Sequence, residues 1–208
     1  ATSASITITA VDVTVHNCLF LANFLDIVTV FDIANAQVAT DFTVDSCEFR
    51  DSSGILDFIG VVTVGTTANI ADGFTFTNNK VFGFQTTPNA ATTAITFGSD
   101  SKRVNISNNV FMHNTAGTDT AAVVFAGGAL NHTQFLMADN IVVRPNTATA
   151  GHLMSSTSTA CSGFLVRNLD WHLDNTAGLI IPTGTKLGFS ENYSMVTGAA
   201  DKSCLINP

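Results

Sequence analysis

Charged residues, and aromatic residues other than phenylalanine, are scarce in this sequence. Charged side chains make up 12% of the 208 residues, and 8 basic against 16 acidic groups give a formal net charge of −8. Proteins that grip a nucleic-acid backbone show the opposite balance, so nucleic acid is not an expected partner. The chain has no run of eighteen apolar residues and no signal-peptide pattern after residue 1, so neither a membrane span nor a secretory signal is predicted.

The residues that usually cover exposed helices are also nearly missing. Glu, Lys, Gln and Arg are rare, whereas Thr, Asn, Ala, Val and 16 Phe dominate, and hydrophobic residues reach 46%. This composition excludes a disordered chain and predicts an all-β protein whose surface is covered by Thr and Asn. The four cysteines, at positions 18, 47, 161 and 204, lack the spacing of a metal site. We therefore expect buried free thiols, no bound metal and no cofactor.

One eight-residue phrase recurs along the whole chain, with the pattern apolar, polar, apolar, two polar residues, Asn or Cys, any residue, apolar. The clear copies are VTVHNCLF (13–20), FTVDSCEF (42–49), FTFTNNKV (74–81) and VNISNNVF (104–111). Weaker copies are FLMADNIV (135–142), FLVRNLDW (164–171) and LGFSENYS (187–194). The sixth position of the phrase, here called the anchor, holds Cys18, Cys47, Asn79, Asn109, Asn140, Leu169 and Asn192.

The anchors follow one another at 29, 32, 30, 31, 29 and 23 residues. A nearly constant spacing over seven copies predicts a repeat protein. The consensus of leucine-rich repeats is absent, and no segment has a helical stripe of apolar residues, so leucine-rich and helical repeats are excluded.

Alternation within the phrase predicts how each repeat folds. The first and third residues point to one side of a strand, the polar pair forms a bend, and the anchor and the residue two positions later face inward again. Another short apolar strand follows each anchor, at 28–31, 56–59, 95–97, 123–125, 153–154, 179–181 and 205–206. We therefore predict a single domain over residues 1–208, a right-handed parallel β-helix of about seven coils and roughly 30 residues per coil, in which 187–208 form the terminal coil.

The anchors are expected to form an inward ladder in which stacked Asn amides satisfy one another and the backbone of the bend. Cys18 and Cys47 take the same place at the N-terminal end, within disulfide range of each other, and we interpret them as two stacked thiols.

Candidate catalytic residues are few. Asp170, His172 and Asp174 alternate along one strand and are predicted to face outward, where they could bind a metal or polarise a water molecule. Asp45 and Glu48, with Arg50 and Asp51, form a second candidate because polysaccharide-cleaving enzymes use pairs of carboxylates. The more ordinary interpretations are a solvated strand face for the first group and an exposed ion-pair cluster for the second. A column of acids, Asp26, Asp32 and Asp57, has no basic partner.

The position three residues after each anchor is unusually apolar for an outward site. It holds Leu21, Arg50, Phe82, Met112, Val143, His172 and Met195. An exposed apolar stripe along a rod marks a contact surface, unless loops cover it. The predicted interface residues are Leu21, Phe82, Met112, Val143 and Met195, at or near the axis of a homotrimer, because closed symmetry buries one such stripe per chain.

These repeats resemble the right-handed β-helix proteins that tailed bacteriophages encode among their virion structural genes. The resemblance is carried by CLFLANF (18–24), CEFRDSSGILDFI (47–59) and NNKVFGF (78–84), and by the tail GTKLGFSENYSMVTGAADKSCLINP (184–208). It covers essentially the whole chain and implies a non-enzymatic capsid decoration or spike-like protein on the virion surface, with other capsid or tail proteins as partners. It supplies no catalytic residues.

Two alternatives stay open: a tailspike-type protein that binds or cleaves host surface polysaccharide, as a lyase or glycoside hydrolase, and a free cellular binding module. The abrupt start, ATSASITIT, predicts that an upstream segment or another subunit covers that end.

Overall fold

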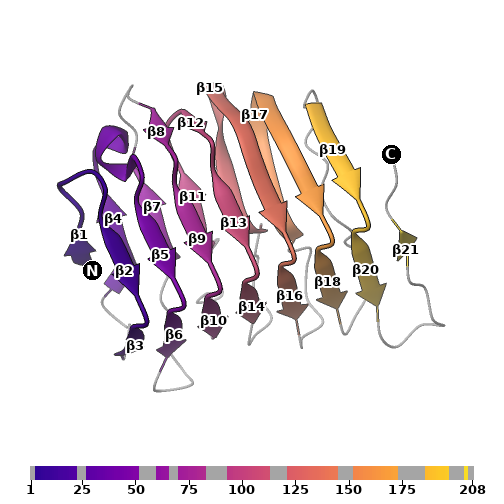
Figure 1. Cartoon of the computed structure of the whole chain (residues 1–208), viewed down its shortest axis with the longest axis horizontal. Helices are drawn as coiled ribbons and strands as arrows, with labels where there is room; N and C mark the ends of the chain where they lie inside the picture. Colours follow the sequence, from indigo (N-terminus) through magenta and orange to yellow (C-terminus); the bar gives the residue numbers. More distant parts are fainter. Residues whose placement is uncertain are drawn as a thin grey trace.

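The computed structural model describes residues 3–22, 27–51, 60–65, 70–82, 93–112, 121–144, 152–172, 186–196 and 204–205. These residues form strands almost throughout, and among them the 3-10 turn η2 (Ala36–Ala39) is the one helical element. Figure 1 shows the strands stacked side by side along the long axis, in chain order from the N-terminus to the C-terminus. The predicted all-β class and parallel β-solenoid are confirmed. No helix in the described part of the chain is long and apolar enough to cross a membrane.

One sheet contains the strands that follow the anchor positions. In spatial order they are β3 (Leu19–Ala22), β6 (Glu48–Asp51), β10 (Lys80–Phe82), β14 (Val110–Met112), β16 (Ile141–Arg144), β18 (Leu169–His172), β20 (Tyr193–Val196) and β21 (Cys204–Leu205). We call this the anchor-side sheet. All neighbouring pairs are parallel except the last, because β21 runs antiparallel to β20.

The other sheet has two arms that meet in one long strand. The first arm contains β2 (Thr14–His16), β5 (Thr43–Asp45), β9 (Thr75–Thr77) and β13 (Asn105–Ser107). The second arm contains β1 (Ser3–Thr7), β4 (Ile27–Ile33), β7 (Gly60–Val64) and β11 (Ile95–Phe97). Both arms pair with β15 (Ala121–Ala138), which continues through β17 (His152–Val166) to β19 (Lys186–Ser190). The short strands β8 (Ala71–Asp72) and β12 (Ser101–Lys102) pair at the corner between the arms.

The bends are made by residues in the left-handed region of backbone space. One such residue lies at the bend before each strand of the anchor-side sheet from β3 to β20, with φ between 50° and 59°: Asn17, Ser46, Asn78, Asn108, Asp139, Arg167 and Glu191. A second stack, Asp12, Asp41, Gly73, Arg103 and Gln134, marks another corner. Asn and Asp tolerate this conformation better than most residues, which explains part of their abundance. The polar pair of the repeated phrase therefore forms a bend as predicted.

Phenylalanine fills the core because the same inward position recurs in successive coils. The rings of Phe20 and Phe49, which hold one inward position in successive coils, stack with centroids 4.8 Å apart. Phe76, which lies on β9 of the other sheet, stacks between Phe49 and Phe111 at centroid distances of 6.2 Å. Offset stacks of this kind add to the burial that each ring contributes. Because each parallel strand stacks on the same strand of the preceding coil, similar side chains pack against one another.

The structure departs from the predicted strands in several places. β7 at Gly60–Val64 was not predicted, and the predicted strands at 56–59 and 179–181 lie outside the described residues. β15 and β17 are long strands that round the corner, where two short strands were predicted. β21 caps the sheet edge antiparallel rather than adding a parallel rung. The coil count differs from the seven that the sequence predicted, and every turn of the solenoid includes a segment outside the described residues.

Candidate functional site

A column of asparagine side chains crosses the core where the first arm meets the anchor-side sheet. In each rung the side-chain Oδ1 accepts a hydrogen bond from the backbone N–H of the preceding anchor, as from Asn79 to Asn109 at 2.9 Å. The side-chain Nδ2 donates to a backbone carbonyl of the preceding coil, as from Asn109 to Phe76 at 2.8 Å. The predicted asparagine ladder is confirmed, and its members are at most 1% exposed: Asn79, Asn109, Asn140, Asn168 and Asn192.

The sixth rung differs from the sequence prediction by one residue. Asn168, and not Leu169, accepts the backbone N–H of Asn140 at 3.1 Å. The register pairs Phe135 with Gly163, so Phe164 lies in an outward position and is 61% exposed. A side chain at Gly163 would overlap the carbonyl oxygen and ring of Phe135. The apolar pair Phe164–Leu165 misled the sequence reading, because a slip of one residue exchanges the two faces of a strand.

This correction also changes the place of the first catalytic candidate. On β18, Asp170 lies in register with Val142 and His172 with Arg144. The position that continues the column of Val143 is Trp171, not His172. Asp174 lies outside the described residues. The register does not bring a second His, Asp or Glu beside these residues on the paired strands.

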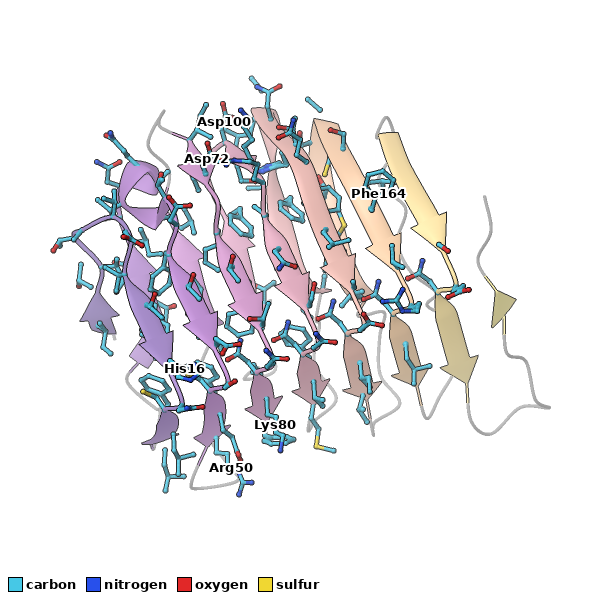
Figure 2. The ribbon with its side chains drawn as sticks, viewed as in Figure 1. His16, Arg50, Asp72, Lys80, Asp100 and Phe164 are labelled. Carbon is cyan, nitrogen blue, oxygen red and sulfur yellow. The ribbon has the colours of Figure 1, made fainter. Side chains whose placement is uncertain are left out.

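Asp45 of the second candidate is the centre of a polar cluster on the first arm, beside His16, which Figure 2 labels. Its carboxylate contacts His16 Nδ1 at 2.9 Å and accepts hydrogen bonds from Asn78 at 2.7 Å and Thr77 at 2.8 Å. The hydrogen bond from Asn78, with those from Thr77, Ser46 and His16, lowers the pKa of Asp45 below its usual value. The carboxylate is therefore ionised and committed to neighbours, which suits a structural link between strands better than proton transfer.

Glu48 does not join Asp45 to form a carboxylate pair. It lies beyond the bend on β6, where it forms an ion pair with Arg50. Arg50 also lies over the ring of Phe82, with its guanidinium carbon 5.4 Å from the ring centroid. Asp51 ends β6. Glu48 and Arg50 thus form a surface ion pair, and such pairs contribute little to stability.

Of the acid column suggested by the sequence, Asp32 is the one member within the described residues. Asp32 lies in register with Thr63, while Asp26 and Asp57 are outside the described ranges. No group of three His, Cys, Asp or Glu side chains that could hold a metal ion forms in the part of the chain that the structure describes.

A buried histidine was missed by the sequence reading. His132 is fully buried at the corner, with Nδ1 2.9 Å from Ser101 Oγ and Nε2 2.9 Å from the carbonyl oxygen of Ala126. A carbonyl oxygen only accepts, so Nε2 donates to it, and in the neutral ring Nδ1 accepts from the Ser101 hydroxyl. Burial lowers the pKa of His132, in agreement with a neutral ring. Its register with Ser101 could have been found only by recognising the corner strand β12.

The outer face of the anchor-side sheet carries two apolar columns. In register, one runs through Leu21, Arg50, Phe82, Met112 and Val143, and the other through Leu19, Glu48, Lys80, Val110, Ile141 and Leu169. Leu19, Leu21 and Ile141 are exposed, whereas Phe82, Met112 and Val143 are half-buried. Met195 lies in register with Trp171 at the far end of the first column. The five predicted interface positions therefore lie along one line of the anchor-side sheet. The charged members of the two columns, Glu48, Arg50 and Lys80, lie toward the N-terminal end of that sheet.

No family model, no curated protein and no solved structure matches this chain.

Proposed function

We propose that this chain is a non-enzymatic structural protein that assembles through the outer face of its anchor-side sheet. The observation that carries the proposal is the pair of apolar columns on that face, which begins with Leu19 at 62% and Leu21 at 59% exposure. Leaving large apolar side chains in water forgoes about 1.5–3 kcal/mol for each one that could be buried. A contact surface is the usual explanation of such a stripe.

The polar chemistry of the described residues supports the non-enzymatic side of the proposal. The best-formed cluster, around Asp45, has its carboxylate committed to His16, Thr77 and Asn78. Glu48 is paired with Arg50 on the other side of the bend. Neither carboxylate faces the other, as the two acids of a glycoside hydrolase must.

We further propose that the chain forms a homotrimer with this face toward the trimer axis. The trimer would lie on the surface of a tailed-bacteriophage virion, as a capsid decoration or spike-like protein. The trimer rests on the argument that three rods around one axis bury one stripe per chain with no open end. The virion role rests on the sequence resemblance. The right-handed sense of the solenoid belongs to the same proposal, and it follows the strong preference of connections between parallel strands.

The assembly is tested by light scattering on two matched substitutions. Phe82→Asp introduces a charge on the anchor-side face, and Phe164→Asp makes the same change on the other sheet, where the ring is already 61% exposed. We expect Phe82→Asp to convert a trimer into a monomer and Phe164→Asp to leave the trimer intact. A wild-type chain that is monomeric at micromolar concentration would overturn the assembly proposal.

The location is tested by asking whether the protein co-purifies with capsids or with tails. Incubation with host capsular polysaccharide or lipopolysaccharide tests the tailspike alternative. New reducing ends or unsaturated products that disappear in Glu48→Gln or Asp170→Asn would overturn the non-enzymatic proposal in favour of a polysaccharide-cleaving spike.

A further inference from the structure

The anchor column changes from asparagine to cysteine in its first two rungs. Cys18 and Cys47 lie level with each other, because Asn17 N–H donates to Asp45 O at 3.1 Å on one side and Glu48 N–H donates to Cys18 O at 2.9 Å on the other. The Sγ of Cys47 accepts the backbone N–H of Cys18 at 3.5 Å. A thiol therefore takes the place that the asparagine Oδ1 has in every later rung.

The two thiols point along the column in the same manner. The Cys47 thiol contacts Asp45 O at 3.2 Å and Val15 O at 3.7 Å, and the Cys18 thiol contacts His16 O at 3.4 Å. Level residues on hydrogen-bonded parallel strands are about 4.8 Å apart. Disulfides join Cα atoms that are about 4.4–6.8 Å apart, so the backbone already meets this requirement.

The two cysteines differ in access. Cys18 is exposed, whereas Cys47 is 2% exposed. Burial raises the pKa of the Cys47 thiol, while the hydrogen bond from the backbone N–H of Cys18 opposes part of that rise. A small oxidant therefore meets Cys18 first, and Cys47 is positioned to react with whatever forms on Cys18.

We propose that Cys18 and Cys47 are a redox pair which a low-molecular-weight disulfide, such as oxidised glutathione, converts into a disulfide bond. The Cys18 thiolate attacks one glutathione sulfur, forms a mixed disulfide and releases one reduced glutathione. The Cys47 thiolate then attacks Sγ of Cys18 and releases the second glutathione. Two protein thiols are oxidised and one glutathione disulfide is reduced, so the electrons balance.

The bond would fasten the first coil of the solenoid to the second. In the described residues, β2 pairs only with β5 and β3 pairs only with β6, so these strands are the end of their stacks. End strands open more readily than central ones because they have one neighbour instead of two. A link between positions 29 residues apart restricts that opening.

The sequence makes the bond easy to assign. No lysine or arginine precedes Arg50, so trypsin releases both cysteines in one peptide, 1–50. Cleavage before aspartate separates Cys18 from Cys47, which then remain together only if a disulfide joins them. The test treats the folded wild-type chain with oxidised glutathione and maps the peptides by mass spectrometry.

We expect the loss of two hydrogen atoms from peptide 1–50 and two remaining thiols of the four. Cys161→Ser, a matched control at another buried cysteine, should form the same bond. Cys47→Ser should stop at a stable mixed disulfide on Cys18. Hydrogen exchange in residues 12–22 should slow by roughly a hundredfold after oxidation. Four unreacted thiols, a bond that involves Cys161 or Cys204, or unchanged exchange in 12–22 would each overturn the proposal.

Discussion

Removal of one asparagine from the middle of the ladder should destabilise the protein more than its small size suggests. Asn109 is fully buried, accepts the N–H of Asn79 at 2.9 Å, and donates to Phe76 O at 2.8 Å and to Asn140 Oδ1 at 3.0 Å. In Asn109→Ala, the N–H of Asn79 and the carbonyl of Phe76 both lose this partner in a buried place. Each buried group left unsatisfied costs about 1–3 kcal/mol, so the free energy of unfolding should fall by roughly 2–6 kcal/mol.

Urea unfolding measures this loss, and Asn131→Ala is the matched control. Asn131 is exposed, and its side chain makes a long contact of 3.5 Å with Ala129 O. We expect the control to change the free energy of unfolding by less than about 0.5 kcal/mol. If Asn109→Ala costs no more than Asn131→Ala, the ladder does not stabilise the fold and the reasoning is refuted.

A second substitution at the same residue separates hydrogen bonding from packing. Asn109→Asp keeps the shape of the side chain but turns the Nδ2 donor into an acceptor that faces Phe76 O and Asn140 Oδ1. Burial beside these two acceptor oxygens raises the pKa of the new carboxyl group in the folded state. The loss of stability should therefore be largest at neutral pH and should diminish as the pH falls below that raised pKa. A loss that does not change with pH would contradict this account.

Three further predictions test the corner and the corrected register. Burial lowers the pKa of His132 from 6.5, so the folded chain should lose stability as the pH falls below about 6.5, and urea unfolding should show a smaller pH dependence in His132→Gln. Gly163→Ala should cost about 1–3 kcal/mol in thermal unfolding, because the new methyl group overlaps Phe135; a neutral result would mean that the two strands are not in this register. Asn168→Ala should cost about as much as Asn109→Ala, whereas Leu169→Ser should cost less than about 1 kcal/mol in the same urea assay; the reverse order would restore Leu169 as the anchor.

The apolar and polar alternation of the repeated phrase was enough to predict the bends and the inward column. Asn79, Asn109 and Asn140 could be placed in one ladder because the phrase has a fixed parity and recurs at nearly constant spacing. The prediction of the sixth rung was wrong because the inward positions of a strand are inferred from its apolar residues. Gly163 gave no apolar signal at the start of its phrase, and the exposed Phe164 gave a false one. A glycine whose missing side chain makes room for a neighbouring ring is visible only when the neighbouring coil is in place.

The sequence by itself therefore determined the all-β class, the parallel stacking of repeats and the chemical character of the ladder, because each follows from local alternation and from spacing along the chain. Only the tertiary structure decided which residues meet across coils. It paired His132 with Ser101, Asp45 with His16, and the Cys47 thiol with the backbone of Cys18. Those contacts depend on loop lengths that vary from coil to coil, and a change of one residue in register moves every later side chain to the opposite face.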